Sequence, residues 1–129
     1  MKIKNKNREH SEQSQLVEWA HLQRGKFPGL GMLYAIPNGG HRHIGAAMKL
    51  KKEGVKRGVP DLCLPVPMGK YHGMYIEFKP EHVPGETNKT YPSLSQKQWL
   101  RALDKLGYKA VLVYGFEEGK AAILDYLTL

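Results

Sequence analysis

The sequence is poor in cysteine and in long apolar runs, and each shortage excludes a class of protein. A single cysteine, Cys63, rules out a disulfide framework and a zinc cluster built on thiolates. No segment approaches the roughly 18 apolar residues that a membrane-spanning helix requires. The polar run MKIKNKNREHSEQSQ fits neither a signal peptide nor an anchor. We therefore expect a protein of the reducing cytoplasm.

Acidic residues are also scarce, and the resulting charge favours a polyanionic partner. Twelve Asp and Glu stand against 20 Lys and Arg, which gives a net charge of +8 and a pI near 9.6. Such a surplus favours contact with phosphates, although a solvated basic surface is an equally good explanation. The length of 129 residues and the 41% hydrophobic content suit one globular domain.

Periodicity and turn residues predict a mixed α/β domain over residues 11–129, preceded by a flexible basic arm at residues 1–10. A hairpin turn is expected at residues 67–70 and a long loop at residues 80–93. The expected elements, in chain order, are a helix from Ser11 to about Gly25, a strand at 32–36, a helix at 44–53, strands at 61–66 and 72–79, a helix ending at Gly107, a strand at 108–115 and a helix at 117–129.

Two helices carry polar residues whose positions suggest specific roles. In the first, Glu12 lies in the apolar stripe of Leu16, Trp19 and Ala20, while Glu18 lies opposite, so Glu12 is expected to point inward. In the later helix, the pattern of a capping box is formed by Ser95 and Gln98, with a hydrophobic staple between Leu94 and Trp99.

Charges inside the apolar strands indicate a site. Residues two apart on a strand share a face, so Glu77 and Lys79 project together while Ile76 and Phe78 face the other way. Asp61 would lie beside Glu77 if the strand at 61–66 pairs with the strand at 72–79. Two adjacent carboxylates repel unless a cation such as Mg²⁺ lies between them, and the lysine would then assist attack on a phosphate. The plainer alternative is a surface ion pair, since an E-x-K triplet is common.

Other polar clusters are less specific. The densest basic patch contains Lys49, Lys51, Lys52, Lys56 and Arg57, which fits a solvated helix face and a phosphate-contacting surface equally. Asn38 and its two glycines form a turn whose amides also suit phosphate binding. A zinc site of His41, His43 and His72 matches no common spacing, so surface or phosphate-contacting histidines are favoured.

Four runs together resemble the virus-type replication-repair nuclease domain, VRR-NUC, a branch of the PD-(D/E)XK nucleases. They are IPNGGHR (36–42), GVKRGVPDLCL (54–64), YIEFK (75–79) and LSQKQWLRALDKLGY (94–108). The resemblance covers roughly residues 11–115. It implies a restriction-endonuclease-like core, a mixed central sheet flanked by helices.

The resemblance also implies roles for individual residues. Asp61 and Glu77 match metal ligands, Lys79 the catalytic lysine, and Glu12 the acidic residue of the first helix. Gln98 matches an active-site glutamine, a role that competes with its predicted capping. Pro80 must end or edge the catalytic strand, because it removes a ladder donor.

The predicted function is a Mg²⁺- or Mn²⁺-dependent DNA endonuclease of replication or repair that uses a metal-activated water. Asp61, Glu77 and Glu12 are expected to hold one or two ions, and the carbonyl of Phe78 is expected to join these metal ligands. Recognition by DNA shape, such as a nick, flap or branch, is favoured over base reading, and a homodimer would suit two strands. A phage or infected bacterium is a fitting source.

Alternatives are a non-catalytic DNA-binding module and a sequence-specific restriction nuclease. The predicted DNA contacts are Asn38, Arg42, Lys49, Lys52, Lys56 and Arg57.

Overall fold

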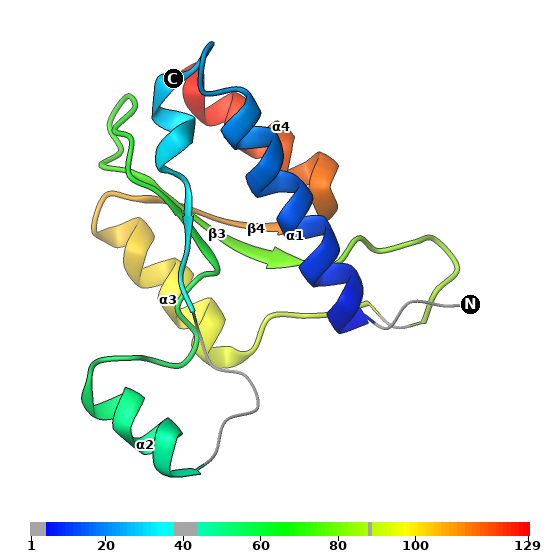
Figure 1. Cartoon of the computed structure of the whole chain (residues 1–129), viewed down its shortest axis with the longest axis vertical. Coiled ribbons are helices and arrows are strands. Elements are labelled where there is room, and N and C mark those ends of the chain that lie inside the picture. Colours follow the sequence, from blue (N-terminus) through cyan, green and yellow to red (C-terminus); the bar gives the residue numbers. More distant parts are fainter. Residues whose placement is uncertain (1–4, 38–43, 88) are drawn as a thin grey trace.

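A four-stranded mixed sheet forms the centre of the computed structural model, which describes residues 5–37, 44–87 and 89–129 (Figure 1). The strands lie in chain order. The first three are antiparallel, and β4 runs parallel to β3. The strands are β1 (Tyr34–Ala35), β2 (Leu62–Leu64), β3 (Met74–Lys79) and β4 (Lys109–Tyr114).

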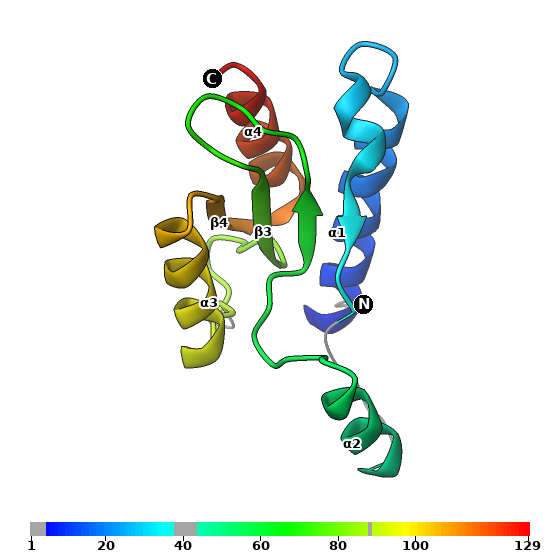
Figure 2. The same cartoon turned by 90° about the vertical axis from the view of Figure 1, so that its left-hand side faces the viewer.

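Helices cover both faces of this sheet, as the predicted α/β class requires. The helices are α1 (Asn5–Leu22), the 3-10 helix η1 (Pro28–Met32), α2 (Ile44–Lys52), α3 (Leu94–Lys105) and α4 (Gly115–Leu127). Helices α1 and α4 pack together on one face and α3 packs on the other, whereas α2 stands apart from the sheet (Figures 1 and 2). The predicted fold class is therefore confirmed. No described helix is long and apolar enough to cross a membrane.

The core lies between the sheet and the pair α1 and α4. Alternation along β3 directs Met74, Ile76 and Phe78 into this layer, and all three are fully buried. Leu16 of α1 and Ile123 of α4 pack against them. The odd-numbered residues of β3 consequently face α3. This single alternation separates the apolar core from the polar face of the sheet.

The first helix begins earlier than the sequence predicted. It starts at Asn5, so residues 5–10, expected to belong to a flexible arm, are helical. Tertiary contacts explain the extension, because Arg8 donates hydrogen bonds to the Glu86 carboxylate and to the Glu81 carbonyl. Such contacts stabilise helical turns whose own propensity is weak. Residues 1–4 lie outside the described part of the chain.

The capping box of α3 also differs from the prediction. The N-cap is Ser93, whose hydroxyl accepts from the Gln96 amide, while the Gln96 side chain accepts from the Ser93 amide at 2.8 Å. The predicted box of Ser95 and Gln98 is wrong by two residues. The predicted staple is wrong with it, since Leu94 is the first residue of α3 and is exposed. The Trp99 indole donates to the Arg57 carbonyl at 3.1 Å.

Gly58 packs tightly where the chain approaches Asp61. Its φ is +89°, and an added Cβ would lie 2.7 Å from the backbone carbon of Ser95. Gly54 has a similar φ of +104° but open space around the same position. Comparing substitutions at the two glycines therefore distinguishes the free-energy cost of backbone strain from that of a steric clash.

We expect Gly58→Ala to lower the free energy of unfolding by about 3 kcal/mol or more, and Gly54→Ala by about 1 kcal/mol. In both variants the alanine must adopt an unfavourable positive φ. Only in Gly58→Ala must the backbone of Ser95 also move away from the new Cβ. Urea denaturation of the two variants beside the parent measures the difference. Equal losses would show that the contact with Ser95 is not a constraint on this turn.

Candidate active site

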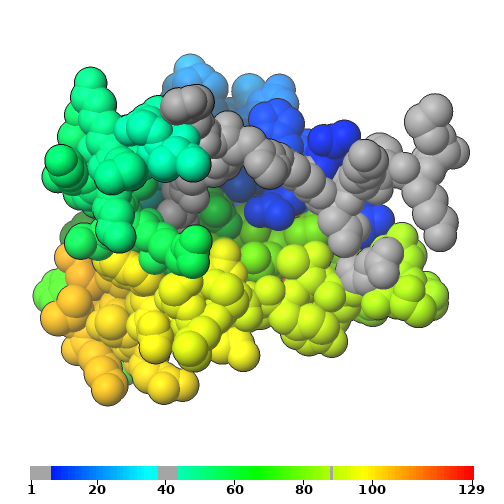
Figure 3. All heavy atoms as spheres, turned by 90° about the horizontal axis from the view of Figure 1, so that it is seen from below, coloured from blue at the N-terminus to red at the C-terminus, as the bar shows by residue number. Residues whose placement is uncertain are grey.

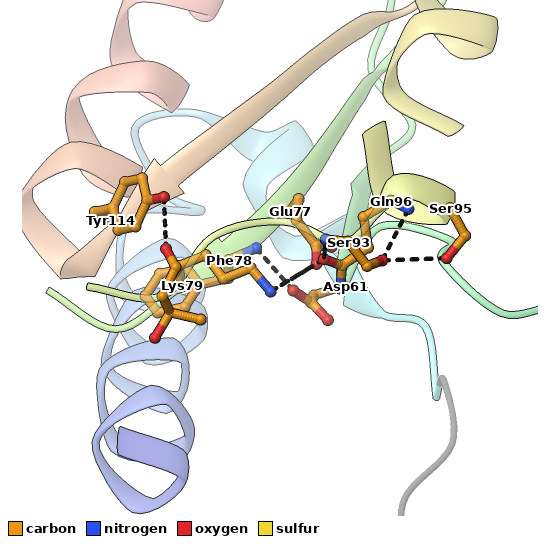
Figure 4. A network of polar contacts seen from close by, with 9 residues as sticks. Asp61, Glu77, Phe78, Lys79, Ser93, Ser95, Gln96 and Tyr114 are labelled. Carbon is orange, nitrogen blue, oxygen red and sulfur yellow. Dashed lines mark hydrogen bonds and ion pairs between the residues drawn. The ribbon is translucent and has the colours of Figure 1, made fainter. Parts of the chain in front are cut away.

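The register of β2 and β3 brings Asp61 to Glu77. Leu62 pairs with Ile76, so the preceding residue, Asp61, lies opposite Glu77. The carboxylate of Asp61 is fixed there because its Oδ2 accepts a hydrogen bond from the Phe78 amide at 2.7 Å (Figure 4). The predicted pairing of the two acids is thus what the structure shows.

Glu77 and Lys79 are ionisable groups almost removed from solvent. Glu77 is 1% exposed and Lys79 is 7% exposed. Lys79 Nζ lies 3.5 Å from Glu77 Oε1 and donates to Gln96 Oε1 at 3.2 Å. Neither carboxylate oxygen of Glu77 accepts a hydrogen bond of ordinary geometry from the described residues. Because unsatisfied buried carboxylates are costly, this pair is not the common surface ion pair and is a candidate site.

Burial and crowding of the acids raise their pKa values. The pKa of Glu77 rises to about 8, chiefly because burial penalises its charged form and secondly because Asp61 is adjacent; Lys79 opposes the rise. Burial also raises the pKa of Asp61, against the stabilising hydrogen bond from Phe78. The two carboxyl groups therefore hold a proton between them near neutral pH when no cation is bound.

The glutamine beside Lys79 is Gln96, whereas Gln98 is exposed on α3. One side-chain oxygen of Gln96 both receives the Lys79 hydrogen bond and caps α3 through the Ser93 amide. The resemblance implied a site role for Gln98, but the glutamine that contacts Lys79 is Gln96. The contact with Lys79 and the capping of α3, which the sequence set in competition, are made by this one residue.

Helix α1 presents two acids toward the end of β3, and Glu18 is exposed as predicted. Glu12 is half-buried, and its Oε2 accepts from the Glu81 amide at 2.8 Å. Glu9, one turn earlier, is the acid whose pKa is raised by burial and by the charge of Asp61, and lowered by Lys79. Sequence reasoning missed Glu9 because the helix was expected to begin at Ser11. The signal was its spacing of seven residues from buried Leu16.

The same helix anchors the chain that leaves the site. Strand β3 ends at Lys79, as Pro80 predicted, and the next residues turn toward α1. Arg8 forms a two-pronged ion pair with Glu86, at 3.1 and 3.2 Å, and also bonds the Glu81 carbonyl. With Glu12 on the Glu81 amide, these contacts fix the first turns of α1 beside the end of β3.

The predicted DNA contacts divide into two groups. Lys49, Lys52, Lys56 and Arg57 are exposed on α2 and just beyond it, as a phosphate-contacting surface requires. Asn38 and Arg42 lie outside the described residues, as do His41 and His43. The third histidine of the zinc alternative, His72, packs edge-on against Tyr108.

A divalent cation fits the site, although no three His, Cys, Asp or Glu side chains in the described ranges converge as a ligand set. Glu77 has two buried oxygens without hydrogen-bond donors, and Asp61 lies next to it. A cation would remove their repulsion and supply the missing partner. Two carboxylates with water completing the shell is the usual environment of Mg²⁺. Asp61 and Glu77 are therefore the residues that would hold the ion.

Without such an ion, Glu77 makes the folded state depend on pH. The group has a raised pKa, so its contribution to stability is complete below about pH 4.5 and is lost as pH rises through about 8. In EDTA, we expect the free energy of unfolding to fall between pH 5.5 and 8.5, measured by urea denaturation. Glu77→Gln should flatten this dependence, because its amide carries no charge at either pH. Identical pH slopes for parent and variant would contradict the assignment.

The chain is similar in sequence and in fold to known proteins. The sequence matches the family model of the VRR-NUC domain over residues 3–117. A solved structure named VRR_NUC domain protein is 30% identical, with a TM-score of 0.79, and the match covers 100% of this chain and 93% of that one. Among curated proteins, no significant match was found. Because the family match spans nearly the whole sequence, the chain belongs to the VRR-NUC family of nuclease-type DNA-processing domains.

Proposed function

We propose that the protein is a Mg²⁺- or Mn²⁺-dependent deoxyribonuclease that hydrolyses phosphodiester bonds at the site of Asp61, Glu77 and Lys79. The observation that carries the proposal is the buried Glu77 carboxylate, whose oxygens lack donors while Asp61 lies beside it. This arrangement is costly without a cation and useful with one. The family assignment supports the reaction class.

When bound, the ion would polarise the phosphate and lower the pKa of the attacking water. The chain's own residues supply position and charge. Asp61 is oriented by the Phe78 amide, so its free oxygen stays directed at the shared site. The Phe78 carbonyl is proposed as a further ligand, and Glu9 as the acid of α1 that acts on the site, since its pKa responds to the charges of Asp61 and Lys79.

Lys79 provides positive charge for the developing phosphate. Its ammonium donates one hydrogen bond to Gln96 and lies 3.5 Å from Glu77 as an ion pair, so it keeps donors for the substrate. A donor placed in a buried site stabilises developing negative charge more strongly than one in water. Gln96 acts through Lys79 and is a positioning residue, because it is fixed by its second bond to the α3 cap.

Substrate choice by DNA shape is part of the proposal. The exposed cations of α2 and the following turn suit phosphate contacts, which position a duplex without reading its sequence. A homodimer would bring two such sites to two strands of a branched substrate. We therefore propose nicked, flapped or branched DNA as the substrate class.

The test is cleavage of supercoiled plasmid and of a four-way junction with Mg²⁺, Mn²⁺ or EDTA. We expect metal-dependent cutting by the parent, and a loss of about 100-fold or more in Asp61→Asn and in Lys79→Ala. Gln96→Ala should lose about 10-fold, while its matched control Gln98→Ala should match the parent. A dimer would cut two opposed junction strands in one binding event.

Three results would contradict the proposal. Cutting in EDTA would show that the reaction does not need a divalent metal ion. Unchanged cutting by Asp61→Asn would show that the reaction takes place at another site. If no DNA is cut while parent and Asp61→Asn bind it equally in a gel shift, the fold serves as a non-catalytic DNA-binding module. Single nicks on the junction would argue for a monomer.

A further inference from the structure

An exposed aromatic residue lies in the segment that leads into α3, and the proposed chemistry does not use it. Tyr91 is 70% exposed. Isolated exposed apolar side chains are ordinary on protein surfaces, so exposure alone carries no meaning. What distinguishes Tyr91 is the set of contacts that fixes the backbone around it and the cation beside it.

The backbone on both sides of Tyr91 is tied down. On one side, the Thr90 carbonyl accepts a hydrogen bond from the Tyr114 hydroxyl at 2.7 Å. On the other, Ser93 caps α3 and its amide donates to Gln96. Pro92 in between restricts the residue before it to extended backbone. Tyr91 is therefore an exposed ring on a segment ordered in advance, which lowers the entropic cost of stacking against it.

A lysine completes the cluster. The ammonium of Lys89 lies 5.8 Å from the ring centre of Tyr91 and 4.9 Å from that of Tyr114. Both distances are in the range of a cation–π contact. An exposed ring with a cation at its side is suited to a ligand that is both flat and anionic. A nucleotide, with its base and its phosphate, has this chemistry.

The two residues that anchor the segment, Tyr114 and Gln96, are both next to Lys79. Tyr114 is the residue of β4 paired with Lys79 in the parallel register. Gln96, which caps the helix after Tyr91, accepts the Lys79 hydrogen bond (Figure 4). In the space-filling view, the end of the loop at residues 80–93 and α3 form one continuous surface (Figure 3). Tyr91 therefore lies on a segment whose two anchors both contact or pair with Lys79, the residue proposed to meet the phosphate.

We propose that Tyr91, with Lys89 beside it, is a stacking platform for an unpaired nucleobase adjacent to the scissile phosphate. The inference rests on the proposed function and narrows its substrate to DNA that carries an unpaired nucleotide, such as a flap or a branch end. A paired base is already stacked on both faces and gains nothing from the ring. Tyrosine is enriched at protein interfaces but lysine is depleted from them, so it is Lys89 that favours a nucleotide over a protein partner.

Binding without cleavage tests the platform. Parent, Tyr91→Ala, Tyr91→Phe and Leu94→Ala would be titrated in EDTA with a flapped oligonucleotide carrying 2-aminopurine as the first unpaired base, and with a fully paired duplex. Leu94 is the matched control, since it is 72% exposed and three residues away but has no ring. Neither side chain is buried, so the variants should melt with the parent.

We expect Tyr91→Ala to weaken flap binding by about 5- to 100-fold and to lose the quenching of 2-aminopurine, with duplex binding unchanged. Tyr91→Phe and Leu94→Ala should behave as the parent. Equal binding of flap by Tyr91→Ala and parent, or equal losses for flap and duplex, would overturn the platform. A change in sedimentation on Tyr91→Ala without a change in flap binding would assign the ring to a protein contact instead.

The assay also separates this inference from the proposed nuclease. If Asp61→Asn abolishes cutting while Tyr91→Ala binds flap normally, the nuclease stands and the platform fails. If nothing is cut but Tyr91→Ala loses flap binding selectively, the platform exists on a domain that only binds DNA.

Discussion

The antiparallel register between β2 and β3 is the constraint on which the site depends. It sets Asp61 opposite Glu77, and the Phe78 amide then fixes the Asp61 carboxylate. Alternation along β3 does the rest, since the same strand sends Phe78 into the core and the charged residues 77 and 79 toward α3. A register shift of one residue would exchange the apolar and the charged faces of β3. The packing of the core therefore also fixes the register that forms the site.

Placing these charges out of water opposes folding, and the surrounding structure compensates for part of that cost. Gln96 gives Lys79 a neutral acceptor, and the α3 cap fixes Gln96. On the other side, α1 is held by Arg8 and Glu12, which bring Glu9 into the field of Asp61 and Lys79. What these contacts leave unsatisfied is the Glu77 carboxylate, and a divalent ion is the partner that would complete it.

Sequence reasoning predicted the parts of the site that depend on strand periodicity. Two-residue alternation was enough to place Glu77 and Lys79 on one face, and an apolar strand ahead of them was enough to pair Asp61 with Glu77. Helix boundaries were less accessible. The run from Ser93 to Gln98 contains the capping pattern in two overlapping registers, and only tertiary contact selects the first. The start of α1 was missed for a similar reason, because long-range bonds from Arg8 stabilise it, and Glu9 was missed with it.

The central claim is that the Asp61 and Glu77 pair exchanges a proton for a divalent ion. Calorimetric titration of Mn²⁺ into the protein at pH 7, in two buffers of different ionisation enthalpy, measures this directly. With the pKa of Glu77 at about 8, binding should release about one proton per ion at pH 7 and far less at pH 9. In Glu77→Gln, that release should be lost. Heats that do not depend on the buffer at pH 7, or the absence of Mn²⁺ binding, would contradict the account.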